Sequence, residues 1–312
     1  MRILGIDTSN YTTSAAFWQP SRSQMDTASK LLPVPKGNMG LRQSEAVFHH
    51  TQALDQMIAS VCEKNDLPTA IGVSVTPRTA NGSYMPCFTV GKMTAHAIGS
   101  ALHIPVMECS HQEGHIAAAA YGAGRTDLLT KQFIAFHVSG GTTEAVLVKP
   151  KDNYGFEVEL IATSLDLKAG QAVDRVGGML DLAFPAGKAL DTLAVKGNLP
   201  RKPKATMKGA DCSLSGIENQ CRQLLDKGTP HEDVARYCIE SVGAAIAAMT
   251  EALLTQYGDL PLLYAGGVMS NSILQKQLSE RFGGCFAPPE FSSDNAAGVA
   301  YLAALRVGEY DE

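Results

Sequence analysis

The sequence lacks the cysteine patterns that mark a structural zinc site or a disulfide-stapled domain. Its 312 residues include seven cysteines, an odd number, and no two of them have CxxC spacing. A zinc ribbon is therefore excluded, and nothing points to a secreted disulfide framework. This cysteine usage fits a reducing compartment, so we expect a cytoplasmic protein.

A long uncharged hydrophobic run is also missing. The acid Asp7 stands where the apolar core of a signal peptide would lie. The longest stretch of small apolar residues, Val242–Leu254, is interrupted by Glu251. We therefore expect no part of the chain to enter a membrane.

An excess of positive charge is absent as well. The formal net charge is -5 and the pI is about 5.9, which argues against a broad basic face that binds nucleic acid unaided. The local exception is Arg201–Gly209, a basic segment expected to be irregular. This segment is either a solvated loop or the best local candidate for a nucleic-acid contact. An RNA substrate would accordingly need help from a partner.

What the sequence does contain is the composition of a globular α/β protein and an internal repeat. Hydrophobic residues make up 45%, charged residues 18%, and there are 29 glycines, in a chain long enough for two domains. Ile3–Trp18 and Phe133–Val148 each read as strand, polar turn and strand. The positions that match at an offset of 130 are Ser9 with Ser139, Thr12 and Thr13 with Thr142 and Thr143, and Ala15 with Ala145. The repeat predicts a duplicated domain whose small-residue tips let backbone N–H groups approach phosphate, as in a nucleotide cleft.

Two histidines at helical spacing form the first candidate metal site. Ser110 and Glu113 make a capping box, which predicts a helix that begins at Ser110 and carries His111 and His115 on one face. Two such imidazoles can bind one metal ion, although Gln112 stands where a zincin would have its glutamate. The alternative is a capped surface helix with two ordinary histidines.

A third ligand is available near the chain's end. Asp294 precedes the last expected helix, where it is fully explained as an N-cap. As a carboxylate it also completes a two-His, one-Asp set with open positions for substrate or water.

Several residues of the second half are candidates for nucleotide contacts. Paired glycines end the expected strand Leu262–Val268, and Asn271 opens the helix that follows. Such glycines let a flat ligand lie against the backbone. Gly187 lies in a turn that leads into another helix, and Asp174 lies on an expected helix, where a solvated charge is the simpler interpretation.

The order of these motifs resembles the TsaD/Gcp family, the glycoprotease M22-like tRNA threonylcarbamoyladenosine transferases, over nearly the whole chain. The motifs are Gly5-Ile-Asp-Thr-Ser9, His111-Gln-Glu-Gly-His115, Val138-Ser-Gly-Gly141, Ala169-Gly-Gln-Ala-Val-Asp174-Arg175, Pro185-Ala-Gly187, Ser213-Leu-Ser-Gly216, Gly266-Gly-Val-Met-Ser-Asn271 and Asp294-Asn-Ala-Ala297. The resemblance implies an actin/hexokinase-like (ASKHA) fold of two related lobes around a central nucleotide and metal cleft. The expected lobes are residues 1–130 and 131–312, with a helical insertion at about 165–230.

The resemblance also implies ligands and chemistry. One divalent ion, iron or zinc, would be bound by His111, His115 and Asp294. ATP or an acyl-adenylate would contact Val138, Ser139, Gly140, Gly141, Thr142, Asp174, Gly187 and Asn271. The implied reaction moves a threonylcarbamoyl group from its adenylate to the exocyclic amine of adenosine-37 in tRNA. No catalytic side chain is assigned beyond the metal site.

The resemblance implies partners too: tRNA bound together with partner subunits, a paralogous ASKHA subunit and a small ATPase. A homodimer is one option for the oligomeric state. An alternative function keeps nucleotide and metal but transfers a different carbamoyl-type group, and another is a non-catalytic nucleotide-binding subunit. A protease is the least expected, since no Ser/His/Asp order is evident.

The chain departs from the family pattern at several positions, which indicates a diverged paralogue. Thr142 replaces the histidine of SGGHT, Leu167 the second of two aspartates, Gln171 a glutamate, and Ala186 the first glycine of PGG. The Gly-Pro-Gly loop expected within residues 76–86 is missing, and Asn10-Tyr-Thr replaces a Cys-Asp-Glu run. The metal ligands are kept better than their surroundings.

Overall fold

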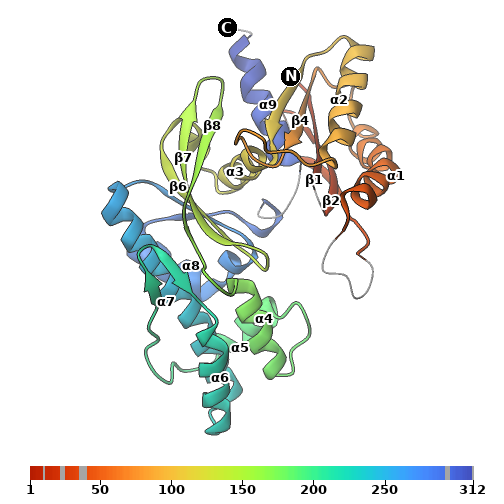
Figure 1. Cartoon of the computed structure of the whole chain (residues 1–312). Helices are drawn as coiled ribbons and strands as arrows, with labels where there is room; N and C mark the ends of the chain where they lie inside the picture. The colour runs from red at the N-terminus through yellow and green to blue at the C-terminus, as the bar shows by residue number, and fades with distance from the viewer. Residues whose placement is uncertain (10, 22–24, 35–40, 292–295, 311–312) are drawn as a thin grey trace. The chain divides into compact units, whose positions relative to one another are not determined.

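The computed structural model describes residues 1–9, 11–21, 25–34, 41–291 and 296–310 (Figure 1). Residue contacts divide the chain into two compact units. Unit 1 consists of Met1–Lys131, Pro150–Glu157 and Glu290–Glu312, and unit 2 of Gln132–Lys149 and Val158–Pro289. The last helix therefore packs with the N-terminal strands.

Unit 1 is built on a five-stranded sheet of order β3-β2-β1-β4-β5. The strands are β1 (Ile3–Ser9), β2 (Thr12–Trp18), β3 (Asp26–Leu31), β4 (Ala70–Thr76) and β5 (Val106–Ser110). The helices are α1 (Gln43–Cys62), α2 (Phe88–Leu102), α3 (His111–Gly122), the 3-10 turn η1 (Thr126–Thr130) and α9 (Ala297–Tyr310).

Alternation along β1 assigns the two faces of this sheet. Leu4 and Ile6 pack in the core beneath α1 and α2, whereas Ile3 packs with the alanines of α9. A Cβ on Gly5 would lie 2.5 Å from the Ala296 carbonyl oxygen, and one on Gly72 would lie 2.5 Å from that of Val299. Glycine at these two positions lets α9 lie directly on the strands (Figure 1).

Unit 2 carries a second five-stranded sheet, of order β12-β11-β6-β7-β8. Its strands are β6 (Phe133–Val138), β7 (Thr143–Lys151), β8 (Gly155–Thr163), β11 (Leu262–Ala265) and β12 (Cys285–Phe286). The remaining elements are α4 (Ala169–Met179), α5 (Gly187–Ala194), the hairpin β9 (Thr206–Lys208) and β10 (Asp211–Ser213), α6 (Gly216–Asp226), α7 (His231–Tyr257), η2 (Gly267–Ser270), α8 (Ser272–Phe282) and η3 (Pro289–Phe291), which crosses into unit 1.

The predicted hairpin repeat is confirmed by the strand register. Ile3 pairs with Trp18 and Thr8 with Thr13; 130 residues later, Phe133 pairs with Val148 and Val138 with Thr143. Beyond the hairpin, β1 pairs in parallel with β4 as β6 does with β11. Both units therefore share one sheet topology.

Several predicted boundaries shift for identifiable reasons. The strand expected over Leu262–Val268 ends at Ala265, because Gly266 has φ +103° and a Cβ there would lie 2.2 Å from the Val138 carbonyl oxygen. The helix expected around Asp174 is α4, Ala169–Met179. The segment expected to be irregular over Arg201–Gly209 contains the short strand β9.

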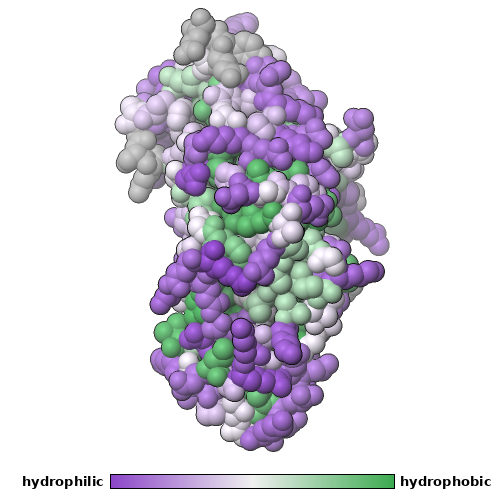
Figure 2. Space-filling model, turned by 90° about the vertical axis from the view of Figure 1, so that its left-hand side faces the viewer, coloured by the Kyte–Doolittle hydropathy of each residue, from purple (hydrophilic) through white to green (hydrophobic). Residues whose placement is uncertain are grey.

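Helix α7 is the one described helix long and apolar enough to cross a membrane, by length and composition. It is instead the central core helix of unit 2, with 61% of its apolar window buried inside the protein. Hydrophilic side chains predominate on the face drawn in Figure 2, with hydrophobic ones in smaller areas between them.

Candidate functional site

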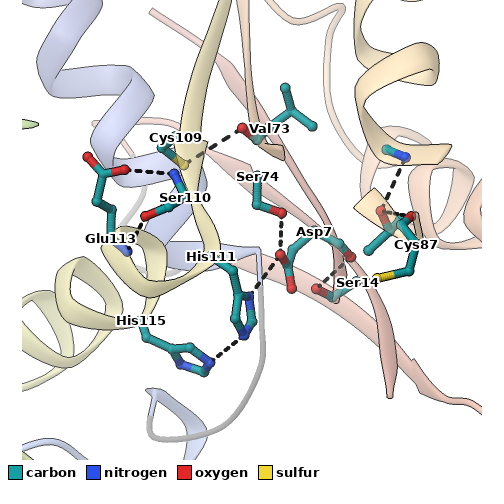
Figure 3. A network of polar contacts seen from close by, with 12 residues as sticks. Asp7, Ser14, Val73, Ser74, Cys87, Cys109, Ser110, His111, Glu113 and His115 are labelled. Carbon is teal, nitrogen blue, oxygen red and sulfur yellow. Dashed lines mark hydrogen bonds and ion pairs between the residues drawn. The ribbon is translucent and has the colours of Figure 1, made fainter. Parts of the chain in front are cut away.

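The two histidines lie at the beginning of α3, directly after β5. The capping box is formed as predicted: Glu113 N donates to Ser110 Oγ at 3.1 Å, and Ser110 N donates to Glu113 Oε2 at 2.7 Å. This places the Nε2 atoms of His111 and His115 2.9 Å apart, pointing toward one another (Figure 3). Both imidazoles thus aim at a common point.

Asp7 orients the first of these rings, and sequence reasoning missed it. His111 Nδ1 lies 3.0 Å from Asp7 Oδ1, the Asp7 side chain is fully buried, and Ser74 Oγ donates to the same carboxylate oxygen (Figure 3). Because a carboxylate only accepts, Nδ1 of His111 carries the proton and Nε2 presents its lone pair. The feature of the sequence that could have indicated this role is an acidic residue near the carboxyl end of a buried strand.

The histidine pair fits a metal ion. Two imidazole nitrogens bound to one tetrahedral zinc lie roughly 3.3 Å apart, so the observed 2.9 Å needs only a small ring movement. The two Nε2 atoms are within hydrogen-bond distance of each other, so a proton held between them must leave or move when a cation binds. Within the described residues no cluster of three His, Cys, Asp or Glu could hold a metal ion. The expected third ligand, Asp294, lies outside the described residues.

A buried ion pair anchors the histidine helix. Arg306 of α9 lies 3.0 Å from Glu113 Oε1, and the two side chains are only 12% and 7% exposed. Arg306 also donates to the carbonyl oxygens of Glu108, Asn153 and Tyr154. A Cβ on Gly298 would lie 1.8 Å from the Gly114 carbonyl oxygen, so α3 and α9 pack backbone to backbone. These contacts hold α3 against α9.

In unit 2 the turn Ser139–Thr142 joins β6 to β7. Ser139 N donates to the Thr142 carbonyl oxygen at 2.7 Å, and Thr142 N donates to Ser139 Oγ at 3.1 Å. Among the described residues, a Cβ on Gly140 or Gly141 would meet nothing within 4 Å, and neither glycine has a left-handed φ. The backbone of the turn is therefore open enough for a ligand to approach closely. Val138, before the turn, is fully buried and paired with Thr143.

The turn is locked to the N-terminus of α4. Ala169 N donates to Thr143 Oγ1 at 2.8 Å and Gly170 N to the Ser139 carbonyl oxygen at 3.1 Å. A Cβ on Gly170 would lie 2.6 Å from Gly140 N. The first amides of α4 are thus used within the protein, which leaves the glycine backbone of the turn as the candidate phosphate contact.

The structure brings Asp174 and Gly187 together. Asp174 Oδ1 accepts a hydrogen bond from Ala186 N at 2.8 Å, which holds the turn with the cis Phe184-Pro185 bond that precedes α5. A Cβ on Gly187 would meet nothing within 4 Å in the part of the chain that the structure describes, so this helix start also has room for a ligand. Asp174 is therefore more than a solvated charge, because it shapes the neighbouring turn.

Asn271 caps α8 beside a cavity. Its side-chain oxygen accepts from Ile273 N and Leu274 N at 3.1 Å each, and the residue is 8% exposed. The adjoining Ser272 donates through its N–H and hydroxyl to Asp191 of α5. A cavity of about 460 Å³ opens beside this junction. It is lined by Val195, Arg236, Ser272, Ile273, Lys276, Gln277 and Glu280.

Comparison with known proteins finds a matching family and a sequence relative. The model of the family described as tRNA N6-adenosine threonylcarbamoyltransferase (TsaD) matches residues 35–301. A tRNA N6-adenosine threonylcarbamoyltransferase of Brucella anthropi is 31% identical over 98% of this chain and 90% of its own length.

Solved structures show the fold. Full-length HypF in its phosphate- and nucleotide-bound form has a TM-score of 0.59 at 13% identity, covering 100% of this chain and 56% of that one. A ROK family glucokinase of Streptomyces griseus, solved with glucose and AMPPNP, has a TM-score of 0.53 at 14% identity, covering 97% and 99%. The duplicated α/β architecture is therefore the actin/hexokinase-like (ASKHA) fold that the sequence predicted. Within this class, the chain belongs to the tRNA N6-adenosine threonylcarbamoyltransferase (TsaD) family.

Proposed function

We propose that this protein moves a threonylcarbamoyl group from its adenylate to the N6 amine of adenosine-37 in tRNA. The observation that carries the proposal is the convergence of the His111 and His115 Nε2 atoms, 2.9 Å apart, in a chain of this family. A relative named for this activity shares 31% identity over almost the entire chain.

His111, His115 and Asp294 would hold one divalent ion, iron or zinc, with Asp7 fixing the His111 ring. That ion would act as a Lewis acid toward acyl or phosphate oxygens. The buried Glu113–Arg306 pair keeps the ligand helix in place, so the two imidazoles remain aimed at one point. Replacing Asp294 by alanine is expected to lower the metal content of soluble protein; full occupancy in elemental analysis would remove this residue from the ligand set.

ATP or the acyl-adenylate would bind to unit 2. The open backbone of Gly140 and Gly141, with Ser139 and Thr142, would contact phosphate. The turn held by Asp174 and the start of α5 at Gly187 would lie along the nucleotide. The cavity beside Asn271 has a volume within the range of small-ligand sites and would take the adenosine end.

In the transfer, the adenosine amine forms a bond to the carbamoyl carbon while the bond from that carbon to the phosphate oxygen breaks. The amine loses a proton, and AMP departs. This chain's own contribution is to fix donor and acceptor in one orientation, which by itself accounts for a large rate increase. The protein would act in the cytoplasm.

A second candidate function is transfer of another carbamoyl-type group, or to another acceptor, by the same site. Leu167, where the resemblance expects an aspartate, is 7% exposed and belongs to the core of unit 2. The neighbouring Lys168 Nζ donates to the Ser164 carbonyl oxygen at 3.0 Å. The polar surroundings of the nucleotide therefore differ from the family pattern.

Nucleoside mass analysis tests the proposal. Unmodified tRNA would be incubated with the protein, preformed threonylcarbamoyl-adenylate and candidate partners, namely a paralogous ASKHA subunit and a small ATPase. We expect modified adenosine that disappears in a His111→Ala, His115→Ala variant. Nucleotide and metal binding without modified adenosine would favour the second function instead.

A further inference from the structure

Helix α5, whose start at Gly187 belongs to the proposed nucleotide site, also carries an exposed cation, and the segment that follows it carries others. Lys188, Thr192 and Lys196 follow one another at four-residue spacing, and all three are exposed. We call the exposed residues Phe184, Lys188, Lys196, Arg201, Lys202 and Lys204 the basic surface.

Most of the positive charge of this surface lies in a segment without acids. Between Asp191 and Asp211 the chain has no acid and five lysines or arginines, four of which belong to the basic surface, although the whole chain carries a net charge of -5. Asp191 itself accepts from Ser272. In the described part of the chain, none of the surface's five cations forms an ion pair, whereas exposed lysines elsewhere, such as Lys149, do.

The backbone that carries these cations is ordered by contacts with α7. Asn198 N donates to Asp233 Oδ1 at 2.7 Å, and a Cβ on Gly197 would lie 2.1 Å from the Glu232 carbonyl oxygen. The Arg201 guanidinium lies 5.0 Å from the centre of the Tyr237 ring. These contacts hold the backbone that carries the cations in one conformation.

Phe184 adds an aromatic ring to the same surface. Its side chain is 83% exposed, the largest value among the exposed large hydrophobic residues of the described chain. The turn that carries Phe184 is held by the hydrogen bond from Ala186 N to Asp174. Ala186 also packs against Gly177, where an added Cβ would lie 2.2 Å from the Ala186 Cβ. Phe184 precedes Lys188 by four residues. An exposed aromatic ring on a segment that also carries cations matches the way proteins bind unpaired RNA bases, by stacking on the ring and pairing with phosphates.

We propose that the basic surface binds the RNA substrate, with its cations at backbone phosphates and Phe184 stacked on an unpaired base. This inference rests on the proposed function, because a tRNA is the acceptor there. Charge complementarity selects a polyanion, and the exposed ring selects one with bases, so RNA fits better than an acidic protein.

Fluorescence anisotropy of labelled unmodified tRNA with the full chain tests this. The variant Lys196→Gln, Lys202→Gln, Lys204→Gln would be compared with Lys131→Gln, Lys149→Gln, Lys151→Gln, which changes net charge equally at exposed, ion-paired lysines. We expect the first variant to bind at least about tenfold more weakly at about 0.1 M salt, with a salt slope smaller by about two. The control is expected to bind within about twofold of the wild type.

Phe184→Ala is expected to weaken binding by about tenfold with an unchanged salt slope, and Phe184→Trp to retain it. Equal affinities of the two triple variants would overturn the proposal. So would a wild-type chain that does not bind RNA at low salt either alone or with the candidate partner subunits, or polyglutamate that competes as well as RNA without dependence on Phe184. The proposed function fails separately, if no modified adenosine forms although RNA is bound.

Discussion

The Oδ1 atom of Asp7 lies 3.0 Å from Nδ1 of His111, which joins the end of β1 to the first residue of α3 across 104 positions of sequence. Replacing Asp7 by asparagine keeps the shape of this buried side chain but removes its charge. We expect divalent metal affinity to fall by about 10–100-fold, because the orienting partner of a ligand histidine is weakened.

Competition with a chelating dye measures this affinity. Ser74→Ala, which removes the hydrogen bond from Ser74 to the Asp7 carboxylate but leaves the histidine contact, serves as the control and is expected to have a smaller effect. An Asp7→Asn protein that folds and binds metal as tightly as the wild type would contradict the assigned role of the carboxylate.

Replacing Arg306 by methionine leaves Glu113 buried without its partner. We expect a loss of about 3 kcal/mol in the free energy of unfolding of unit 1, because removing one partner of a buried ion pair leaves the other charge buried and uncompensated. Urea unfolding measures the change. Lys149→Gln breaks an exposed pair with Glu159 and is expected to cost less than about 1 kcal/mol. Similar losses for both variants would mean that the Arg306 pair is not effectively buried.

Substitutions at Gly141 and Gly170 distinguish an effect on packing from an effect on ligand binding. Gly141→Ala places a methyl group in open space, so we expect a stability change within about 0.5 kcal/mol. The same methyl group would crowd a bound phosphate and weaken ATP binding by about tenfold or more, roughly 1.4 kcal/mol. Gly170→Ala instead meets the backbone of Gly140 at 2.6 Å and should destabilise unit 2 by about 2 kcal/mol.

Thermal unfolding and calorimetric titration with ATP distinguish these outcomes. Unchanged ATP affinity in Gly141→Ala would mean that the turn does not contact the nucleotide.

His50 gives unit 1 a defined pH dependence. Burial lowers the pKa of His50 from 6.5, although the Ser9 backbone and the Asp7 charge act in the opposite direction. Below about pH 6.5 the unfolded chain therefore binds a proton that the folded chain does not. Stability from the neutral ring is complete above this pH and is lost as the pH falls toward the lowered folded value.

We expect the melting temperature to fall between about pH 7.5 and pH 5, and to fall less steeply in His50→Asn. Asparagine retains polar atoms near Thr13, the partner of His50 Nδ1 at 2.7 Å. Parallel pH profiles of wild type and variant would show that His50 does not titrate on unfolding.

The sequence predicted features whose cause is local. The capping box and the facing histidines of α3 follow from three- and four-residue spacing, and the repeat at offset 130 follows from strand pattern, so these survive in the structure. Partners far apart in sequence could not be predicted. Asp7 and His111, or Ala169 and Thr143, meet only because sheet order places them together. The end of β11 likewise depends on how closely Gly266 approaches Val138.

Helix α9 has a consequence for how the protein is made. Its alanines cover Ile3, Ala16 and Ala70, so residues synthesised first obtain their partners only when the last helix leaves the ribosome. Unit 2, whose segments lie between Gln132 and Pro289, is complete earlier. During translation one apolar face of the N-terminal sheet therefore remains exposed to solvent while more than half of the chain is synthesised. Chaperones can bind this exposed face during that time.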